Sequence, residues 1–333
     1  SPNHDDPLNF PESGWWGRIL SAMKVLIPIV IGLLVVGCGG SKEKVAPKSQ
    51  AKTDATPKAK AKPKADAKKT EPPKSTPEKR IVDPILEEAI WDQLRADYRE
   101  GMDALRDPGL SEEKRNDLDI QTEAIREKLK QPTGELTKAD LEKVTELNLN
   151  SKKLTGVPKE LEKLTQLKEL ILHSNKLTNL KRLEKLTQLK YLVLNINQLT
   201  DVKELENLTQ LTVLYLESNQ LTNVKGLEKL TQLTYLSLDS NRLTEVKGLQ
   251  NLTQLTALYL SRNRLTDVNG LGKLTQLETL WLDDNQLTNV KSLENLTQLT
   301  ELNLKDNPDL TKDQIDELQK ALPKCKIFSN PTK

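Results

Sequence analysis

Aromatic rings and carboxylates recur at a fixed spacing in this sequence and could form a binding surface. The rings occupy two positions that flank one leucine of each repeat, and the acids follow two residues later. Such rings anchor protein interfaces and also stack on sugars, although Tyr and Trp favour exposed strand positions in any sheet. The candidate ligand-binding residues are Tyr191, Tyr215, Glu217, Tyr235, Asp239, Tyr259, Trp281 and Asp283.

Residue types suited to catalysis or metal binding are sparse. His4 and His173 are the two histidines, they lie far apart in sequence, and the two cysteines are Cys38 and Cys325. A zinc site usually needs four clustered His or Cys ligands, and nucleophilic catalysis needs a base beside its nucleophile. The sequence therefore predicts no catalytic residues, no metal, no cofactor and no enzymatic activity.

The charge is balanced over the whole chain but uneven along it. Fifty Lys and Arg face 48 Asp and Glu, which gives a net charge of +2 and no basic domain of the kind that nucleic acids need. Residues 41–79 hold twelve lysines against five acids, a net +7, while residues 1–40 carry −1 and residues 80–333 carry −4. We expect no nucleic-acid partner.

The first forty residues indicate export. Met23 and Lys24 precede a twelve-residue apolar run, Val25–Val36, which is too short to span a bilayer and fits a signal peptide. The run ends in Leu-Val-Val-Gly-Cys at residues 34–38, which resembles the lipobox of bacterial lipoproteins. That resemblance implies a signal peptide at 23–37, lipidation of Cys38, and a mature chain held in the cell envelope, facing away from the cytoplasm. It also implies the outer membrane if the organism is Gram-negative, because Gly39 and not Asp follows. Residues 1–22 are then upstream sequence or a mis-called start.

Two further segments precede the repeats. Residues 38–79 are rich in Lys, Pro and Ala and too poor in apolar residues to fold, so they predict a disordered linker behind the lipid anchor. Residues 80–135 predict a helical cap, because Asp83-Pro84 is a helix start and apolar residues follow at helical spacing. Asp107-Pro108-Gly109 divides the cap into two helices, and Ser111 can start the second.

From residue 136 to about 310 the chain repeats every 22 residues. Leu-Thr-Gln-Leu begins at 164, 186, 208, 230, 252, 274 and 296, and an Asn follows eleven residues after each start. With a degenerate first copy we count about eight units. A fixed period in this range predicts a solenoid, since one unit cannot bury its leucines alone.

One unit, residues 208–229, predicts the structure of all. Leu211, Leu214 and Leu216 face inward around a short strand at Val213–Glu217, and the Asn219 amide can satisfy backbone groups at the turn. Stacked strands would form a parallel sheet on a concave face. The unit is too short for a full return helix, so 3₁₀ turns or extended chain are expected on the convex side.

This pattern resembles the internalin-like leucine-rich repeat proteins. The resemblance implies an α/β solenoid, a leucine-rich repeat horseshoe with a parallel concave sheet, an N-terminal helical hairpin cap and a C-terminal cap at 311–333. In that cap Thr311 and Gln314 resemble a capping box, and Cys325 is a buried apolar residue. The departure is the helical cap, where an insertion of about one hairpin separates two halves of the usual single cap.

We expect a non-enzymatic, membrane-anchored module that binds a protein through the concave face, as an adhesin or cell-envelope scaffold. The alternative is binding of carbohydrate or peptidoglycan, such as cell-wall glycan, by the same aromatic residues. A monomer is expected.

Overall fold

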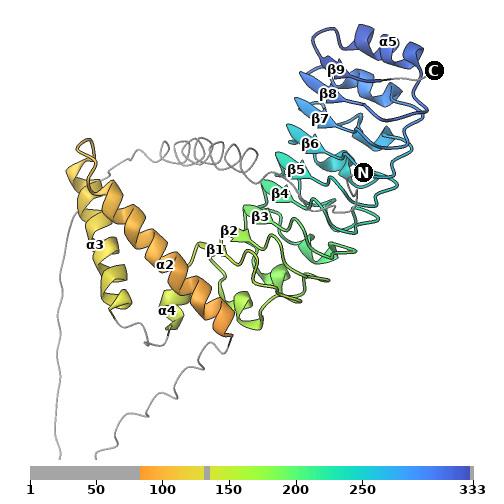
Figure 1. Ribbon diagram of the computed structural model, residues 1–333. Coiled ribbons are helices and arrows are strands. Elements are labelled where there is room, and N and C mark those ends of the chain that lie inside the picture. Colours follow the sequence, from red (N-terminus) through yellow and green to blue (C-terminus); the bar gives the residue numbers. More distant parts are fainter. Residues whose placement is uncertain (1–82, 131–135, 331–333) are drawn as a thin grey trace, which may run out of the picture. The chain divides into compact units, whose positions relative to one another are not determined.

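The structure is a computed structural model that describes residues 83–130 and 136–330. The predicted upstream segment, signal peptide, linker and lipidated Cys38 lie outside the described residues. Figure 1 shows the described part as a stack of short strands in chain order, with helices α2, α3 and α4 at the β1 end and α5 at the β9 end.

Nine three-residue strands form one parallel sheet in the order β1 to β9. Within the regular repeats each strand pairs with its neighbour at an offset of 22 residues, as Leu170 with Leu192 and Leu192 with Leu214. The predicted parallel sheet is confirmed, with strands shorter than expected: β4 ends at Tyr215 and not at Glu217. The strands are β1 Glu146–Asn148, β2 Glu169–Ile171, β3 Tyr191–Val193, β4 Val213–Tyr215, β5 Tyr235–Ser237, β6 Ala257–Tyr259, β7 Thr279–Trp281, β8 Glu301–Asn303 and β9 Lys326–Phe328.

The core is a column of leucines from successive repeats. Leu211, Leu214 and Leu216 are fully buried, as are Leu221 and Leu227 on the return path of the same unit. Removing this apolar area from water stabilises each repeat only when neighbours cover it. The return path, called here the convex face, contains the expected 3₁₀ turns: η1 Lys159–Lys163, η2 Leu183–Lys185, η3 Lys203–Leu205, η4 Leu249–Asn251, η5 Asn269–Leu271 and η6 Lys291–Asn295.

A buried asparagine closes each repeat where the strand turns toward the convex face. Asn241 Oδ1 accepts the backbone N–H of Leu221 at 3.0 Å. Its Nδ2 donates to the carbonyls of Leu216 at 2.9 Å and Leu238 at 3.0 Å. The same bonds recur at the other repeats, so the predicted role of these asparagines is confirmed. Each one ties two successive repeats together.

The N-terminal cap consists of α2 (Pro84–Ala104), α3 (Glu112–Leu129) and the short α4 (Lys138–Leu141). Asp83 caps α2 as expected, because its Oδ1 accepts the backbone N–H of Ile85 at 3.0 Å. Only the first half of α2 reaches the core, where Ile90 and Trp91 are buried. Met102, further along the same helix, is 37% exposed. Further along, α2 packs on α3, and its Asp97 and Glu100 lie near Glu146 of β1.

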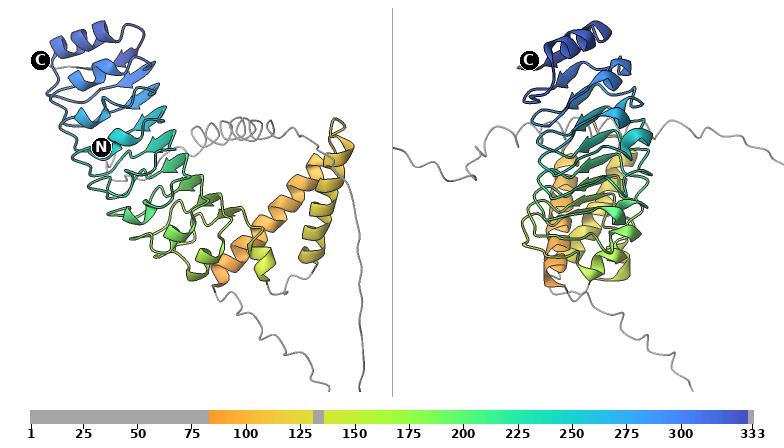
Figure 2. Two further views of the ribbon diagram at one scale, coloured as in Figure 1. Left: turned by 180° about the vertical axis from the view of Figure 1, so that it is seen from behind. Right: turned by 90° about the vertical axis from the view of Figure 1, so that its right-hand side faces the viewer.

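The C-terminal cap adds a strand that the repeat count missed. Helix α5 (Lys312–Ala321) begins with the expected capping box between Thr311 and Gln314. After it, β9 pairs with β8, Ile327 opposite Leu302, although the segment lacks the Leu-Thr-Gln-Leu signature. Cys325 is 5% exposed and is a free cysteine, as predicted. Figure 2 shows from two further sides that α5 lies at the C-terminal end of the stack.

Candidate functional site

The outward face of the sheet, called here the concave face, carries the aromatic residues named from the sequence. Tyr191 and Tyr235 are the first residues of β3 and β5, whereas Tyr215, Tyr259 and Trp281 are the third residues of β4, β6 and β7. The inward leucine of each strand lies between these two positions and is buried. Strand alternation thus points every ring away from the core.

The five rings contact one another in series, and we call them the ring ladder. Centroid distances are 5.8 Å for Tyr191 to Tyr215, 4.8 Å for Tyr215 to Tyr235, and 5.2 Å for Tyr235 to Tyr259. Trp281 meets Tyr259 edge to face at 5.2 Å. These tilted arrangements are the ones that ring quadrupoles favour. The ladder is a continuous, preorganised surface and not five separate rings.

Alternating positions make this contact possible. Val213 and Ala257 are small side chains beside the rings of Tyr191 and Tyr235, and Ser237 stands between Tyr215 and Tyr259 in their own position. The first four rings therefore alternate between the two positions, whereas Tyr259 and Trp281 lie directly opposite each other in register. Sequence spacing alone placed the rings on one face but did not predict that they touch.

The tyrosine hydroxyls are linked and remain protonated. Tyr215 hydrogen-bonds both Tyr191 and Tyr235. Burial raises the pKa of Tyr215, and that of Tyr259 is raised by burial and then by the nearby Asp239 carboxylate. The ladder therefore offers neutral phenols at physiological pH.

Glu217, Asp239 and Asp283, called here the carboxylate row, lie beyond the strand ends of β4, β5 and β7. Asp239 Oδ1 accepts the backbone N–H of Ser261 at 2.7 Å, and the Ser261 hydroxyl donates to Asp283 Oδ1 at 2.6 Å. Burial raises the pKa of Asp239 to about 7, and Glu217 and Asp283 contribute to the rise by repulsion. Burial also raises the pKa of Glu217, opposed by Arg262. The structure brings the predicted carboxylates together on one side of the rings.

A second acidic group lies at the first strands and was not named from the sequence. Glu146 and Glu169 occupy the first positions of β1 and β2, directly opposite in register. Burial raises the pKa of Glu146 to about 7, with further contributions from Glu169 and from Asp97 and Glu100 of α2. Their strand position was the available signal. Their closeness to α2 was not readable, because it depends on how the helix packs.

Other polar groups give little chemistry. Burial lowers the pKa of His173, so the imidazole is neutral at pH 7. Trp281 Nε1 is buried without a hydrogen-bond partner, a rare state for a donor. Within residues 83–130 and 136–330, no three His, Cys, Asp or Glu side chains are grouped to hold a metal ion.

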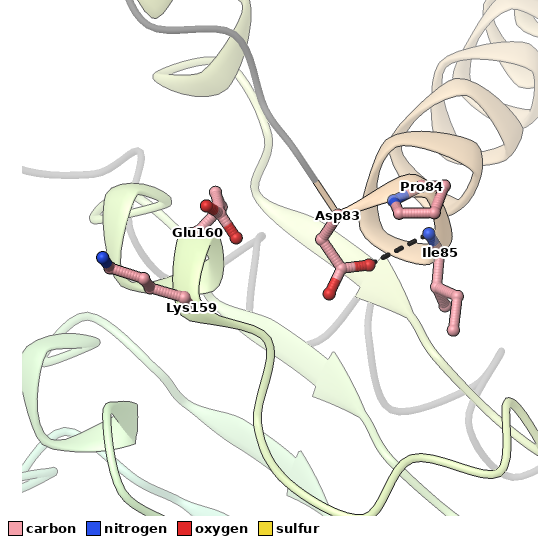
Figure 3. Close-up of a pocket in the computed structure, with 5 residues that line it drawn as sticks. All are labelled: Asp83, Pro84, Ile85, Lys159 and Glu160. Carbon is pink, nitrogen blue, oxygen red and sulfur yellow. Dashed lines mark hydrogen bonds between the residues drawn. The ribbon is translucent and has the colours of Figure 1, made fainter.

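A depression at the start of α2 is lined by Asp83, Pro84, Ile85, Lys159 and Glu160. Figure 3 shows that the Asp83 carboxylate points to the backbone of its own helix, where it bonds Ile85. The carboxylate is therefore engaged as a helix cap, and the depression holds no constellation for catalysis.

The repeats match a known family. The family model for "Leucine Rich repeats (2 copies)" matches five overlapping segments, at 165–207, 187–229, 209–251, 231–273 and 253–295. The matched segments run from 165 to 295, and this part of the chain is similar to leucine-rich repeats. Its internalin-like pattern agrees with this match, and the predicted horseshoe of repeats is confirmed. No curated protein matches this chain.

Three of the solved structures that are similar to this chain come from Listeria monocytogenes and Leptospira interrogans. Internalin C2 of Listeria monocytogenes is 28% identical, with a TM-score of 0.48, over 68% of this chain and 94% of that one. Internalin F of the same organism is 21% identical, with a TM-score of 0.36, over 75% of this chain and 83% of that one. A leucine-rich repeat protein of Leptospira interrogans is 30% identical, with a TM-score of 0.41, over 57% of this chain and 62% of that one.

No helix among the described residues has both the length and the apolar content that a membrane span requires.

Proposed function

We propose that this protein is a non-enzymatic binding module that presents its concave face to a protein partner. The observation that carries the proposal is the ring ladder, in which five aromatic residues contact one another across five strands. Preordered aromatic side chains lose little conformational freedom on binding and are frequent hot spots. The leucine-rich repeats supply a rigid framework for them.

The ring geometry favours a protein over a carbohydrate. A sugar stacks on an open ring face, but here each ring leans on its neighbour, with interplanar angles of 37° to 72°. Edges and hydroxyls are what these rings offer. A protein surface with apolar and hydrogen-bonding side chains fits such edges better than a flat sugar face does.

The test is binding by a full-length variant in which Tyr215, Tyr259 and Trp281 are all replaced by alanine. A matched control replaces three convex-face acids, Glu184, Glu206 and Glu245, by alanine. We expect chemical crosslinking on intact cells to join a defined protein to the wild type and the control but not to the ring variant. Circular dichroism must show that the ring variant is folded.

Two outcomes would redirect the proposal. Retention on purified peptidoglycan that the ring variant loses would support the carbohydrate alternative instead. Equal crosslinking by the ring variant and the control would remove the concave face as the binding site.

We further propose that the module is exported and anchored through a lipid on Cys38, as an adhesin or envelope scaffold. The support is the sequence of residues 23–38, in which an apolar run ends at Leu-Val-Val-Gly-Cys. Two or more acyl chains would hold the protein durably, whereas one would not. Mass spectrometry of the native N-terminus should find a diacylated Cys38. Persistent membrane attachment of Cys38→Ser would contradict the anchor.

A further inference from the structure

The acids of the concave face lack the basic partners that Glu162 and Glu206 have on the convex face. In the part of the chain that the structure describes, none of Glu217, Asp239 and Asp283 forms an ion pair, and neither do Glu146 and Glu169. Two basic residues lower the pKa of these acids without forming an ion pair. Arg262 acts on Glu217 in this way, and Lys168 acts on Glu146.

Two acids on the convex face have a lysine partner. Glu162 Oε2 lies 2.9 Å from Lys185 Nζ, and Glu206 Oε2 lies 3.2 Å from Lys229 Nζ. In both pairs the lysine belongs to the following repeat. The same 22-residue framework can therefore place a base beside an acid, and on the concave face it does not.

The rings give the unpaired acids a second attraction for cations. The Asp239 carboxylate is close enough to Tyr235 and Tyr259 to raise the pKa of both hydroxyls, after burial. An ammonium or guanidinium group can interact with the face or the hydroxyl oxygen of a tyrosine ring and, at the same time, with a carboxylate. Arginine in particular combines ring stacking with bidentate carboxylate binding.

The two acidic groups are separated by a distance that a short peptide spans. From β1 to β5 there are four strand spacings, and Asp239 lies four residues further along its strand than Glu146 does along its own. On a flat sheet this amounts to about 23 Å, which about seven residues of extended chain would cover.

We infer that the concave face takes an extended cationic segment of its protein partner, with Lys or Arg side chains about seven residues apart. One cation lies against the carboxylate row and the ring ladder, and the other lies against Glu146 and Glu169. The inference rests on the proposed function and specifies its partner. Charge complementarity is the argument for this occupant, because each of these acids can pair with a base and has no basic partner of its own.

The test uses the full chain and a synthetic Ser/Ala peptide that carries two lysines about seven residues apart. Isothermal calorimetry at low salt and pH 8 compares the wild type with the Glu217→Gln/Asp239→Asn variant. Both substitutions keep the shape, and the amide introduced at position 239 retains an oxygen that can accept the Ser261 N–H. The matched control is Glu245→Gln/Asp119→Asn, at two exposed acids away from the concave face.

We expect the double variant to bind the lysine peptide at least about tenfold more weakly, while the control binds like the wild type. Added salt should weaken binding by the wild type. A peptide with glutamate in place of lysine should not bind. Equal affinity of the double variant and the control, or equal binding of both peptides, would overturn the inference.

Failure here is distinguishable from failure of the proposed function. A crosslinked partner that is lost with the ring variant, yet binds the Glu217→Gln/Asp239→Asn variant as tightly as the wild type, would keep the proposed function. The cationic segment alone would then be wrong. If the partner binds both variants as tightly as it binds the wild type, the proposed function and the cationic segment are both wrong.

Discussion

Two carboxylates, Glu162 on the convex face and Asp239 on the concave face, have pKa shifts of opposite direction. On the convex face the Lys185 ammonium lowers the pKa of Glu162, the direction expected for an acid with a paired base. On the concave face burial and neighbouring acids raise the pKa of Asp239 to about 7. Glu162 lies on η1, and Asp239 lies just beyond the end of β5. The difference shows that the repeat fixes position, while the residue placed there decides whether charge is compensated.

The contrast also separates stability from binding. Exposed ion pairs on a surface contribute little to folding, so the convex face is mainly solvated. Half-buried acids without bases oppose folding, and a protein that keeps them has a use for them elsewhere. The concave face is accordingly the face where substitutions can improve stability and impair binding together.

The largest expected effect is at the turn that both faces share. Replacing Asn241 by alanine leaves the Leu221 N–H and the Leu216 and Leu238 carbonyls without their partner. We expect the free energy of unfolding to fall by about 2–4 kcal/mol, because buried unpaired groups are costly. Urea denaturation measures it. The control Asn223→Ala, where one Lys225 N–H is lost, should cost much less. Equal losses would show that the buried asparagines are not special.

The next largest effect is expected at Asp239, the acid of the concave face whose pKa is raised to about 7. The pKa of Asp239 is about 7 in the folded protein against an ordinary value of 3.8. Between pH 4 and pH 7 the folded state therefore holds a proton that the unfolded state has lost, so stability falls as pH rises through this window. Asp239→Asn removes the penalty. At pH 8 it should stabilise by about 1–2 kcal/mol, allowing for partial hydration of the carboxyl.

Thermal denaturation as a function of pH checks this linkage. The gain from Asp239→Asn should vanish near pH 4, where the acid is protonated in the folded state. Groups that face Asp239 are Glu217, Asp283 and the Ser261 N–H. A gain that is constant from pH 4 to pH 8 would mean that charge is not its cause. Asp119→Asn, on exposed α3, should show no such dependence.

A smaller effect is expected at the rim between the faces. The residue before each buried asparagine has a left-handed backbone, and at one repeat it is Ile196, with φ 54°. A β-branched residue is strained there, whereas Asn tolerates the conformation. Ile196 is also 51% exposed, so little packing is lost on substitution. Ile196→Asn should raise the unfolding free energy by about 1 kcal/mol in urea denaturation. A loss of stability would contradict the strain.

The smallest effect is expected on the convex face. Glu206→Gln breaks the pair with Lys229, whose side chain is 64% exposed. The cost should be below about 0.5 kcal/mol and should disappear in high salt. A double-mutant cycle with Lys229→Gln measures the pair. A coupling as large as the effect of Asp239→Asn would end the contrast between the two faces.

The sequence was sufficient to predict the repeats and to predict which residues share a face of the sheet. The Leu-Thr-Gln-Leu spacing predicted the sheet register, and the asparagines at a fixed offset predicted the turns, because both depend on local periodicity. Ring-to-ring contact between Tyr215 and Tyr235 and the acid cluster around Glu146 depend on how strands and α2 pack. Strand β9 lacks the repeat signature, so periodicity was silent there. The binding role of the candidate residues and the lipid on Cys38 stay predictions.

The alternation of ring positions along the strands limits how the protein can change in length. Every regular unit pairs at the same offset, so losing residues 213–234 would leave an intact sheet with Leu192 beside Leu236. Tyr191 and Tyr235 would then stand directly opposite in one position, without the staggered Tyr215 between them. Gain or loss of a single unit thus preserves the sheet but changes which rings are neighbours on the concave face. An insertion or deletion that keeps the binding specificity therefore has to keep the order of ring positions.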